Sequence, residues 1–409
     1  MVKNDFYQTL IKKLYKISGT NWYLSTCKSC NHFFLSPEPQ ATNCGSYSCN
    51  YETSKISEID TNLRKNQSLL EISNLIATYF KTKGYVIEKP MEIIHAYKGK
   101  ARLDSMKTTL FTVAGVQLID KKVPKEPTYI PQPSVRLKWL KSYSDINPKK
   151  PYSTSFVNIT TLQAIERIDD FYIQLQDWLE LLNRFSLLNK IKLKIKETQI
   201  RWSEKRANGI FLKVNYHGVE LGDIGLIFDF PFNKNYRSHL IDIGFGLERL
   251  GWIINGTRSY FDVIGPLLLS ALKKYVVIDH VRTLTLIVGS NVSLRNTVHG
   301  KKIGKLVDHL VECGEMFFDF LPLVVYYYNF WKNFIYLPLK PTEIEYEIKR
   351  EINRKINKRL LNKGFKKYLL QGMEDLPTYE LVDRILKERN IHPNTMKNLI
   401  YKTLYRDNA

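Results

Sequence analysis

The residues best suited to chemistry lie between His239 and Leu250, where charged side chains interrupt an apolar run. The short apolar run Leu240, Ile241 and Ile243 predicts a buried strand, and apolar residues at helical spacing follow from Leu247. Gly244 and Gly246 between them permit a sharp turn and the close approach of a ligand. The charged residues of the stretch are Asp242, Glu248 and Arg249. Since buried charges are costly unless they are paired or used, this is either a ligand site or an ordinary strand–turn–helix with a surface Glu–Arg pair.

An arginine and an aromatic residue occupy two further strands. Pro131 and Pro133 hold the chain extended and place Arg136 on a strand, and 152–157 predicts a returning strand that carries Phe156. Arginine binds phosphate oxygens in bidentate fashion, and an aromatic ring can stack on a base. A surface arginine and a core phenylalanine are the alternative.

Two carboxylates, Glu220 and Asp223, precede the apolar run 226–228. Carboxylates so placed can hold Mg²⁺ and a triphosphate, or they can cap a turn. The sequence contains no G-x-x-x-x-G-K-[ST] loop, so a P-loop nucleotide site is not expected.

Four cysteines form the pattern C-x2-C-x13-C-x4-C: Cys27, Cys30, Cys44 and Cys49. Two such knuckles can close a tetrahedral zinc site that has no open position for catalysis. The alternative is a loop-rich subdomain with reduced structural cysteines.

The elements that must position these residues indicate an α+β protein. Helices are expected at 6–17, 68–84 and 162–188, with strands at 211–219, 226–228 and 240–243. Links of hairpin length favour a mostly antiparallel sheet with flanking helices. We expect three parts: a Cys-rich segment (1–65), a catalytic domain (66–255) and a helical domain (256–409).

The composition favours a polyanionic partner. The 409 residues carry 61 Lys and Arg against 40 Asp and Glu, a formal charge of +21, and such an excess suits nucleic acid before membrane. The sequence has no apolar run of about 20 residues, so no membrane span is predicted. The N-terminus lacks a signal-peptide core, so a cytoplasmic protein is expected. A predicted helix that starts with Lys301, Lys302 and Lys305, close after Asn296, could bind an RNA backbone while the amide reads a base edge.

These residues together resemble a known family. Arg136, Phe156 and the run Gly244–Arg249 are similar to motifs 2 and 3 of class II aminoacyl-tRNA synthetases. Within that class the chain resembles the catalytic and tRNA-binding N-terminal part of an alanyl-tRNA synthetase of the archaeal type. The segments 27–49, 132–137, 154–156, 218–223, 241–249 and 279–282 carry this resemblance.

The resemblance implies a class II antiparallel sheet followed by an all-α tRNA-recognition domain, and the activation of alanine by ATP before its transfer to the 3′ end of tRNA-Ala. Arg136 would bind the α-phosphate, while Phe156 and Arg249 would hold the adenine. Glu220 and Asp223 would lie at the metal end of the site. Asp242 would bind the ammonium of alanine, with room provided by Gly244.

The resemblance also implies that Asn296 reads the acceptor-stem G·U pair, with Asp375 as its candidate companion. Editing and C-terminal domains of the family are missing from the 409 residues, so the chain is expected to be either a natural split subunit, with a second polypeptide that carries them, or a shortened form of a longer chain.

Two departures from the family keep alternatives open: Val157 stands where a Glu is usual, and 203–209 retains only Asn208 and Gly209 of an expected Gly-rich stretch. The alternatives are a catalytically impaired synthetase-like RNA-binding protein and an amino-acid-activating paralogue.

Overall fold

The protein is described by a computed structural model that covers residues 2–49, 66–91, 93–97, 100–103, 124–137, 140–148, 151–202, 205–231, 237–294, 300–313 and 319–362. It divides into two compact units. The first comprises Met1–Met91, Lys107–Ser134 and Phe156–Val263, and the second comprises Glu92–Met106, Val135–Ser155 and Ile264–Ala409. The division into three parts expected from the sequence stays a prediction.

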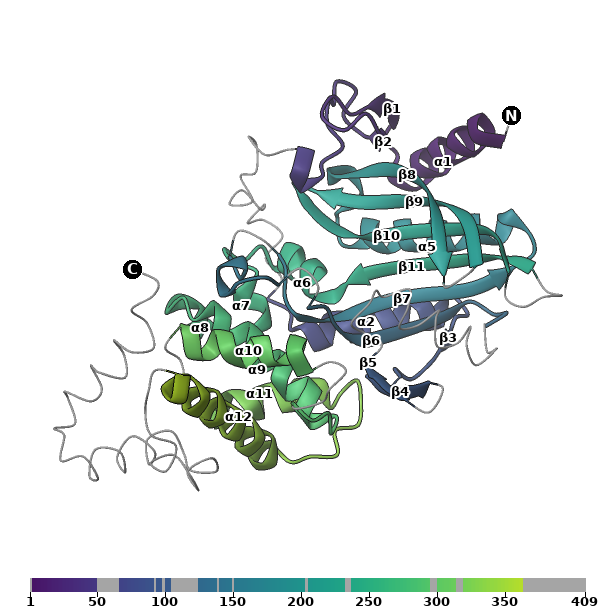
Figure 1. Cartoon of the computed structure of the whole chain (residues 1–409). Coiled ribbons are helices and arrows are strands. Elements are labelled where there is room, and N and C mark those ends of the chain that lie inside the picture. Colours follow the sequence, from purple (N-terminus) through teal and green to yellow (C-terminus); the bar gives the residue numbers. More distant parts are fainter. Residues whose placement is uncertain are drawn as a thin grey trace, which may run out of the picture. The chain divides into compact units, whose positions relative to one another are not determined.

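The first unit is built on a nine-stranded sheet with the strand order β1-β2-β8-β9-β10-β11-β7-β6-β3 (Figure 1). Its strands are β1 (Tyr23–Thr26), β2 (Phe33–Ser36), β3 (Val86–Ile87), β6 (Thr128–Val135), β7 (Ser155–Ile165), β8 (Ile191–Trp202), β9 (Lys205–Tyr216), β10 (Val219–Pro231) and β11 (Arg237–Gly246). The neighbours from β8 to β11, and β11 with β7, pair antiparallel, whereas β3 and β6 are parallel. The structure therefore confirms the α+β class and the mostly antiparallel sheet.

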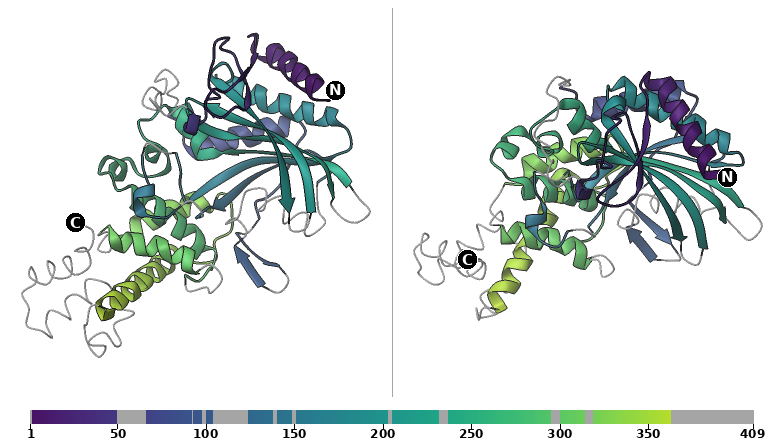
Figure 2. Two further views of the ribbon diagram at one scale, coloured as in Figure 1. Left: turned by 45° about the horizontal axis from the view of Figure 1, so that its top comes forward. Right: turned by 90° about the horizontal axis from the view of Figure 1, so that it is seen from above.

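Helices cover one face of this sheet (Figure 2). They are α1 (Val2–Ser18), α2 (Leu69–Thr82), α5 (Ile168–Arg184) and α6 (Leu247–Asn255). On α5, Trp178 stacks on Phe245 of β11 with ring centroids 4.4 Å apart, and its indole N–H donates to Thr161 of β7. Because side chains alternate along a strand, Asp242 and Gly244 must point to the opposite face, away from the helices.

One boundary expected from the sequence is wrong. The helix predicted from residue 162 begins at Ile168, and Leu162 and Ile165 belong to β7. Apolar residues three apart fit a helix face, but here every residue of the segment is buried or half-buried within the sheet, so the spacing carried no helical information.

The second unit contains a two-stranded sheet, β4 (Ile94–Tyr97) and β5 (Lys100–Leu103), and a set of helices. The helices are α8 (Leu267–Ala271), α9 (Tyr275–Gly289), α10 (Gly300–Glu312), α11 (Leu321–Trp331) and α12 (Pro341–Asn362), and α7 (Phe261–Ile264) contributes only its last residue to this unit. Helix α9 is buried from Val277 to Gly289 and contacts α10, α11 and α12. Within the described residues, no helix is both long and apolar enough to cross a membrane.

Candidate functional site

The register of β10 and β11 brings predicted site residues onto one face of the first unit. Asp223 lies opposite Gly244, and Gly225 lies opposite Asp242. Residues two apart on a strand share a face, so the side chains of Asp223 and Asp242 lie on the face that the helices leave open. The carboxylates that the sequence places 19 positions apart are therefore neighbours in the fold.

A register shift in β10 turns Glu220 to the same face. Glu220 pairs with Asn215 of β9 and Asp223 pairs with Lys213, with Leu221 as the extra residue. In a regular strand, residues three apart point to opposite faces, and a bulge restores a common side. The ammonium of Lys213 then contacts both carboxylates, at 3.0 Å from Glu220 and 3.2 Å from Asp223.

Lys213 is a site residue that the sequence did not reveal. Its strand was predicted, but only the register identifies its partners. Although burial opposes a charged ammonium, Asp223 and Glu220 raise the pKa of Lys213. Burial and the charge of Glu220 raise the pKa of Asp223, because two carboxylates share one lysine.

Asp242 is the group best placed to bind a cationic ligand. It is half-buried, and burial, with the charge of Asp223 second, raises the pKa of its carboxyl group to about 7. Gly225 opposite it tolerates no side chain, because an added Cβ would lie 2.6 Å from the Phe211 ring and 2.7 Å from the Asp242 carbonyl. Because the Asp242 carboxylate is poorly solvated, an ammonium group beside it would stabilise its charged form more than it would stabilise an exposed carboxylate.

Beside Asp242, a buried amide lies over Gly244. Asn158 of β7 is 4% exposed, and its Nδ2 has no hydrogen-bond partner among the described residues. A Cβ on Gly244 would meet this amide at 3.1 to 3.2 Å, so glycine leaves room for it. Buried polar groups are normally paired, and no sequence pattern pointed to Asn158.

The two charged residues at the start of α6 have separate roles. The Nη1 of Arg249 donates to the carbonyl of Glu220 at 2.6 Å and so supports the shifted part of β10. Glu248 is fully buried, and its carboxylate accepts the N–H of Val157 at 2.9 and 3.1 Å. The sequence offered a surface Glu–Arg pair as one interpretation, but a fully buried Glu248 excludes it.

Phe156 and Val157 start β7 with opposite orientations. Phe156 is half-buried, and by alternation it shares the face of Asn158. Val157 is fully buried and points toward the helices. Val157, where the sequence resemblance led us to expect a Glu, therefore lies on the face away from Asp242.

Arg136 belongs to the second unit, one residue after the end of β6. It is half-buried, and its N–H donates to the carbonyl of Thr154 at 2.8 Å. Thr154 is in turn held by Asp279 of α9, which accepts from the backbone N–H at 2.7 Å and from the hydroxyl at 2.6 Å. The sequence placed Arg136 on the strand, but β6 ends at Val135, and Arg136 is instead linked to α9 through Thr154.

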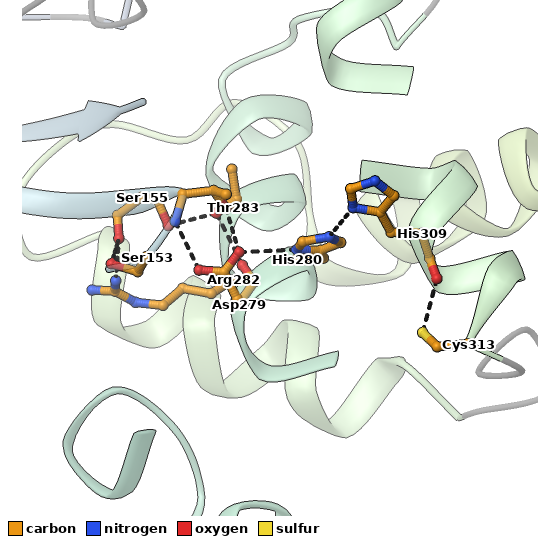
Figure 3. A network of polar contacts seen from close by, with 9 residues as sticks. Ser153, Ser155, Asp279, His280, Arg282, Thr283, His309 and Cys313 are labelled. Atoms are coloured by element: carbon orange, nitrogen blue, oxygen red, sulfur yellow. Dashed lines mark hydrogen bonds and ion pairs between the residues drawn. The ribbon is translucent and has the colours of Figure 1, made fainter. Parts of the chain in front are cut away.

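These contacts extend into a buried network (Figure 3). Arg282 donates to the carbonyl of Ser155 at 2.7 Å, and Thr283 donates to its hydroxyl at 2.8 Å. His280 lies 2.9 Å from Asp279 through Nδ1 and 3.1 Å from His309 of α10 through Nε2. Burial, with His280 second, lowers the pKa of His309 to about 4. The residues 279–282, marked in the sequence only by resemblance, are therefore a structural clamp on the segment 154–155.

The four cysteines fit a zinc ion. Their sulfurs all lie within 4.8 Å of one another, and the sulfurs of Cys30 and Cys44 are 3.9 Å apart. A tetrahedral site with Zn–S bonds of about 2.3 Å requires sulfurs roughly 3.8 Å apart. Although burial opposes the thiolate, backbone N–H groups of Cys44, Cys30 and Ser29 lower the pKa of Cys27 to about 6. The cluster is joined to the sheet by Asn215, whose amide donates to the carbonyl of Cys44 at 3.3 Å.

Of the predicted RNA-binding residues, only some are described. Lys305 is exposed on α10, and Lys301 and Lys302 belong to the first turn of the same helix. Asn296 and Asp375 lie outside the described residues. In the altered segment, Asn208 is exposed and Gly209 is buried in β9.

Known proteins resemble the chain only in part. No protein-family model matches it. The chain is similar to alanine–tRNA ligases of archaea. That of Methanosarcina mazei is 22% identical over 273 residues, which cover 62% of this chain and 28% of the relative. That of Methanococcus aeolicus is 26% identical over 286 residues, 65% of this chain and 29% of the relative. Among solved structures, pyrrolysyl-tRNA synthetase from Desulfitobacterium hafniense matches with a TM-score of 0.33 and 12% identity, over 52% of this chain and 77% of that one.

The chain thus spans less than a third of the length of these curated relatives. The sequence similarity supports a place for it among the aminoacyl-tRNA synthetases.

Proposed function

We propose that the chain activates alanine with ATP and transfers it to the 3′ end of tRNA-Ala, as an alanine–tRNA ligase. The observation that carries the proposal is Asp242, a poorly solvated carboxylate between glycines on the open face of the sheet. Its surroundings suit the ammonium of a small amino acid. The similarity to alanine–tRNA ligases supports the same substrate.

In this proposal the chain's side chains divide the work of adenylate formation. Asp242 binds the alanine ammonium and so orients the carboxylate that attacks the α-phosphorus. Arg136 neutralises charge on the α-phosphate, and Arg249 and Phe156 hold the nucleotide. Magnesium arrives with ATP and shields its phosphates. Such positioning and charge neutralisation supply most of the catalysis in phosphoryl chemistry.

The tRNA half of the proposal rests on the charge of +21 and on the basic start of α10. Lys301, Lys302 and Lys305 would contact the acceptor-stem backbone, while Asn296 with Asp375 would read the G·U pair.

Alanine-dependent ATP–pyrophosphate exchange tests the first step, run against all common amino acids. We expect exchange with alanine and its loss in Asp242→Ala. Exchange with another amino acid alone would favour an activating paralogue. Its absence with every amino acid, while acceptor-stem RNA still binds, would favour an impaired RNA-binding relative.

Charging of transcripts tests the second step. Asn296→Ala should leave exchange intact and impair charging of a transcript with the G·U pair. Normal charging by this variant would place the wobble-pair reader elsewhere.

The cysteine cluster has a structural part in the proposal. Cys27, Cys30, Cys44 and Cys49 would hold one zinc ion with no open position, which fixes the 27–49 segment against the sheet. Metal analysis of the purified chain tests it, and one zinc per chain is expected.

A further inference from the structure

The carboxylate pair expected to bind Mg²⁺ already holds a cation of the protein. The ammonium of Lys213 lies 3.0 Å from Glu220 and 3.2 Å from Asp223. A divalent ion would need to stand between the same oxygens at about 2.0 to 2.6 Å. Ion and ammonium cannot share that space, so the residues present do not fit a metal ion at this pair.

The fold builds this arrangement through three independent features. The extra residue Leu221 turns both carboxylates to one face. The register of β9 sets Lys213 directly opposite Asp223. Arg249 fixes the carbonyl of Glu220 at 2.6 Å, so the shifted backbone is held from a second element.

Two cations of the protein already act on the carboxylate pair. Glu220 and Asp223 contribute two negative charges, and Lys213 and Arg249, which acts electrostatically on Asp223, contribute two positive ones. Within the described part of the chain, the one group of three or more potential metal ligands is the cysteine cluster.

We propose that Lys213 is the resident cation of the Glu220–Asp223 pair: the pair binds no divalent ion, and the fixed ammonium faces the nucleotide phosphates in its place. Magnesium then enters the site only on the nucleotide. The part that concerns phosphates rests on the proposed function, whereas the part that concerns metal does not. Lys213 thus contacts both carboxylates and, on the proposed function, also the nucleotide.

Binding of Mn²⁺ in the absence of nucleotide tests the metal part of the proposal. Electron paramagnetic resonance measures this binding on the full chain, with the cysteines loaded with zinc. The wild type and the Glu220→Gln variant should bind the same amount of Mn²⁺, because the pair binds none. Lys213→Met should gain one Mn²⁺ site, and the double variant should lose it again. Lys213→Arg, which keeps the charge, should bind no Mn²⁺ and controls for folding.

Two results would overturn the proposal. One is a Mn²⁺ site in the wild type that Glu220→Gln abolishes. The other is a folded Lys213→Met variant, by circular dichroism, that still binds no Mn²⁺, because the lysine would then not stand where a metal could.

Pyrophosphate exchange tests the phosphate part separately. Lys213→Met should raise the KM for ATP about tenfold or more, the effect of losing one charged contact, and Lys213→Arg should restore most of it. An unchanged KM for ATP would remove the ammonium from the nucleotide. If no amino acid supports exchange in the wild type, the proposed function fails while the Mn²⁺ result still decides the metal part.

Discussion

Acidification should destabilise the second unit through His309 of α10. This histidine is 4% exposed and resists protonation. Burial, and second the charge of His280, lower its pKa from 6.5 to about 4. The charges of Asp308 and Asp145 raise the pKa of His309, whereas that of Lys305 lowers it further. The folded protein therefore keeps His309 neutral down to about pH 4, whereas the unfolded chain protonates it near 6.5.

The magnitude follows from this difference of about 2.5 pH units. Between pH 7 and pH 4 the unfolded chain takes up a proton that the folded protein does not, so stability falls as the pH falls. At ~1.4 kcal/mol per unit, the loss is about 3 kcal/mol from His309 alone. Asp242 acts with the opposite sign, because its pKa is raised to about 7 in the folded state. A comparison of variants is therefore needed to isolate His309.

His309→Asn provides that comparison, because its amide N–H can occupy the place of Nδ1 and donate to His280 without titrating. Urea unfolding of both proteins at pH 7, 5.5 and 4 measures the free energy of unfolding. The wild type should lose about 3 kcal/mol more than the variant over this range. Parallel profiles for the two proteins would refute the reasoning.

Three further predictions concern the first unit. Asp242→Asn should abolish alanine-dependent exchange yet raise the melting temperature at pH 8; the gain should be much smaller at pH 5 and vanish only below about pH 4, where the unfolded wild type is protonated as well. A lower melting temperature at pH 8 would contradict the pKa direction. Asn158→Leu removes a buried amide whose Nδ2 has no described partner and should stabilise the protein by about 1 kcal/mol in urea unfolding, while lowering exchange; a clear loss of stability would show that this Nδ2 is paired. Cys44→Ser should eliminate bound zinc and lower the melting temperature by several degrees, whereas Cys313→Ser, outside the cluster, should change neither.

The strand–turn–helix at the site could be predicted because the apolar pattern changes within a few residues. Leu240, Ile241 and Ile243 form a short apolar run typical of a buried strand, and Leu247 and Leu250 recur at helical spacing, with glycines between. The cysteine cluster could be predicted for a similar reason, since its ligands are close in sequence. Local patterns of this kind need no knowledge of the tertiary fold.

What could not be predicted depends on register. Lys213 is one of many lysines until β9 and β10 are aligned, and Glu248 shows its partner only when α6 meets β7. The link from Asp279 to Thr154 joins residues 125 positions apart. No spacing in the sequence encodes such pairs, because they are set by the packing of whole elements.

The irregularity at Leu221 makes the chemistry of this sheet sensitive to the number of residues as well as to their identity. Deleting that one residue would keep every charged side chain of the site and restore a regular strand. One of the two carboxylates would then turn into the helix-covered interior, and Lys213 would keep a single partner. Among related chains, a one-residue gap at this point would therefore alter the site as much as a substitution of Glu220 or Asp223.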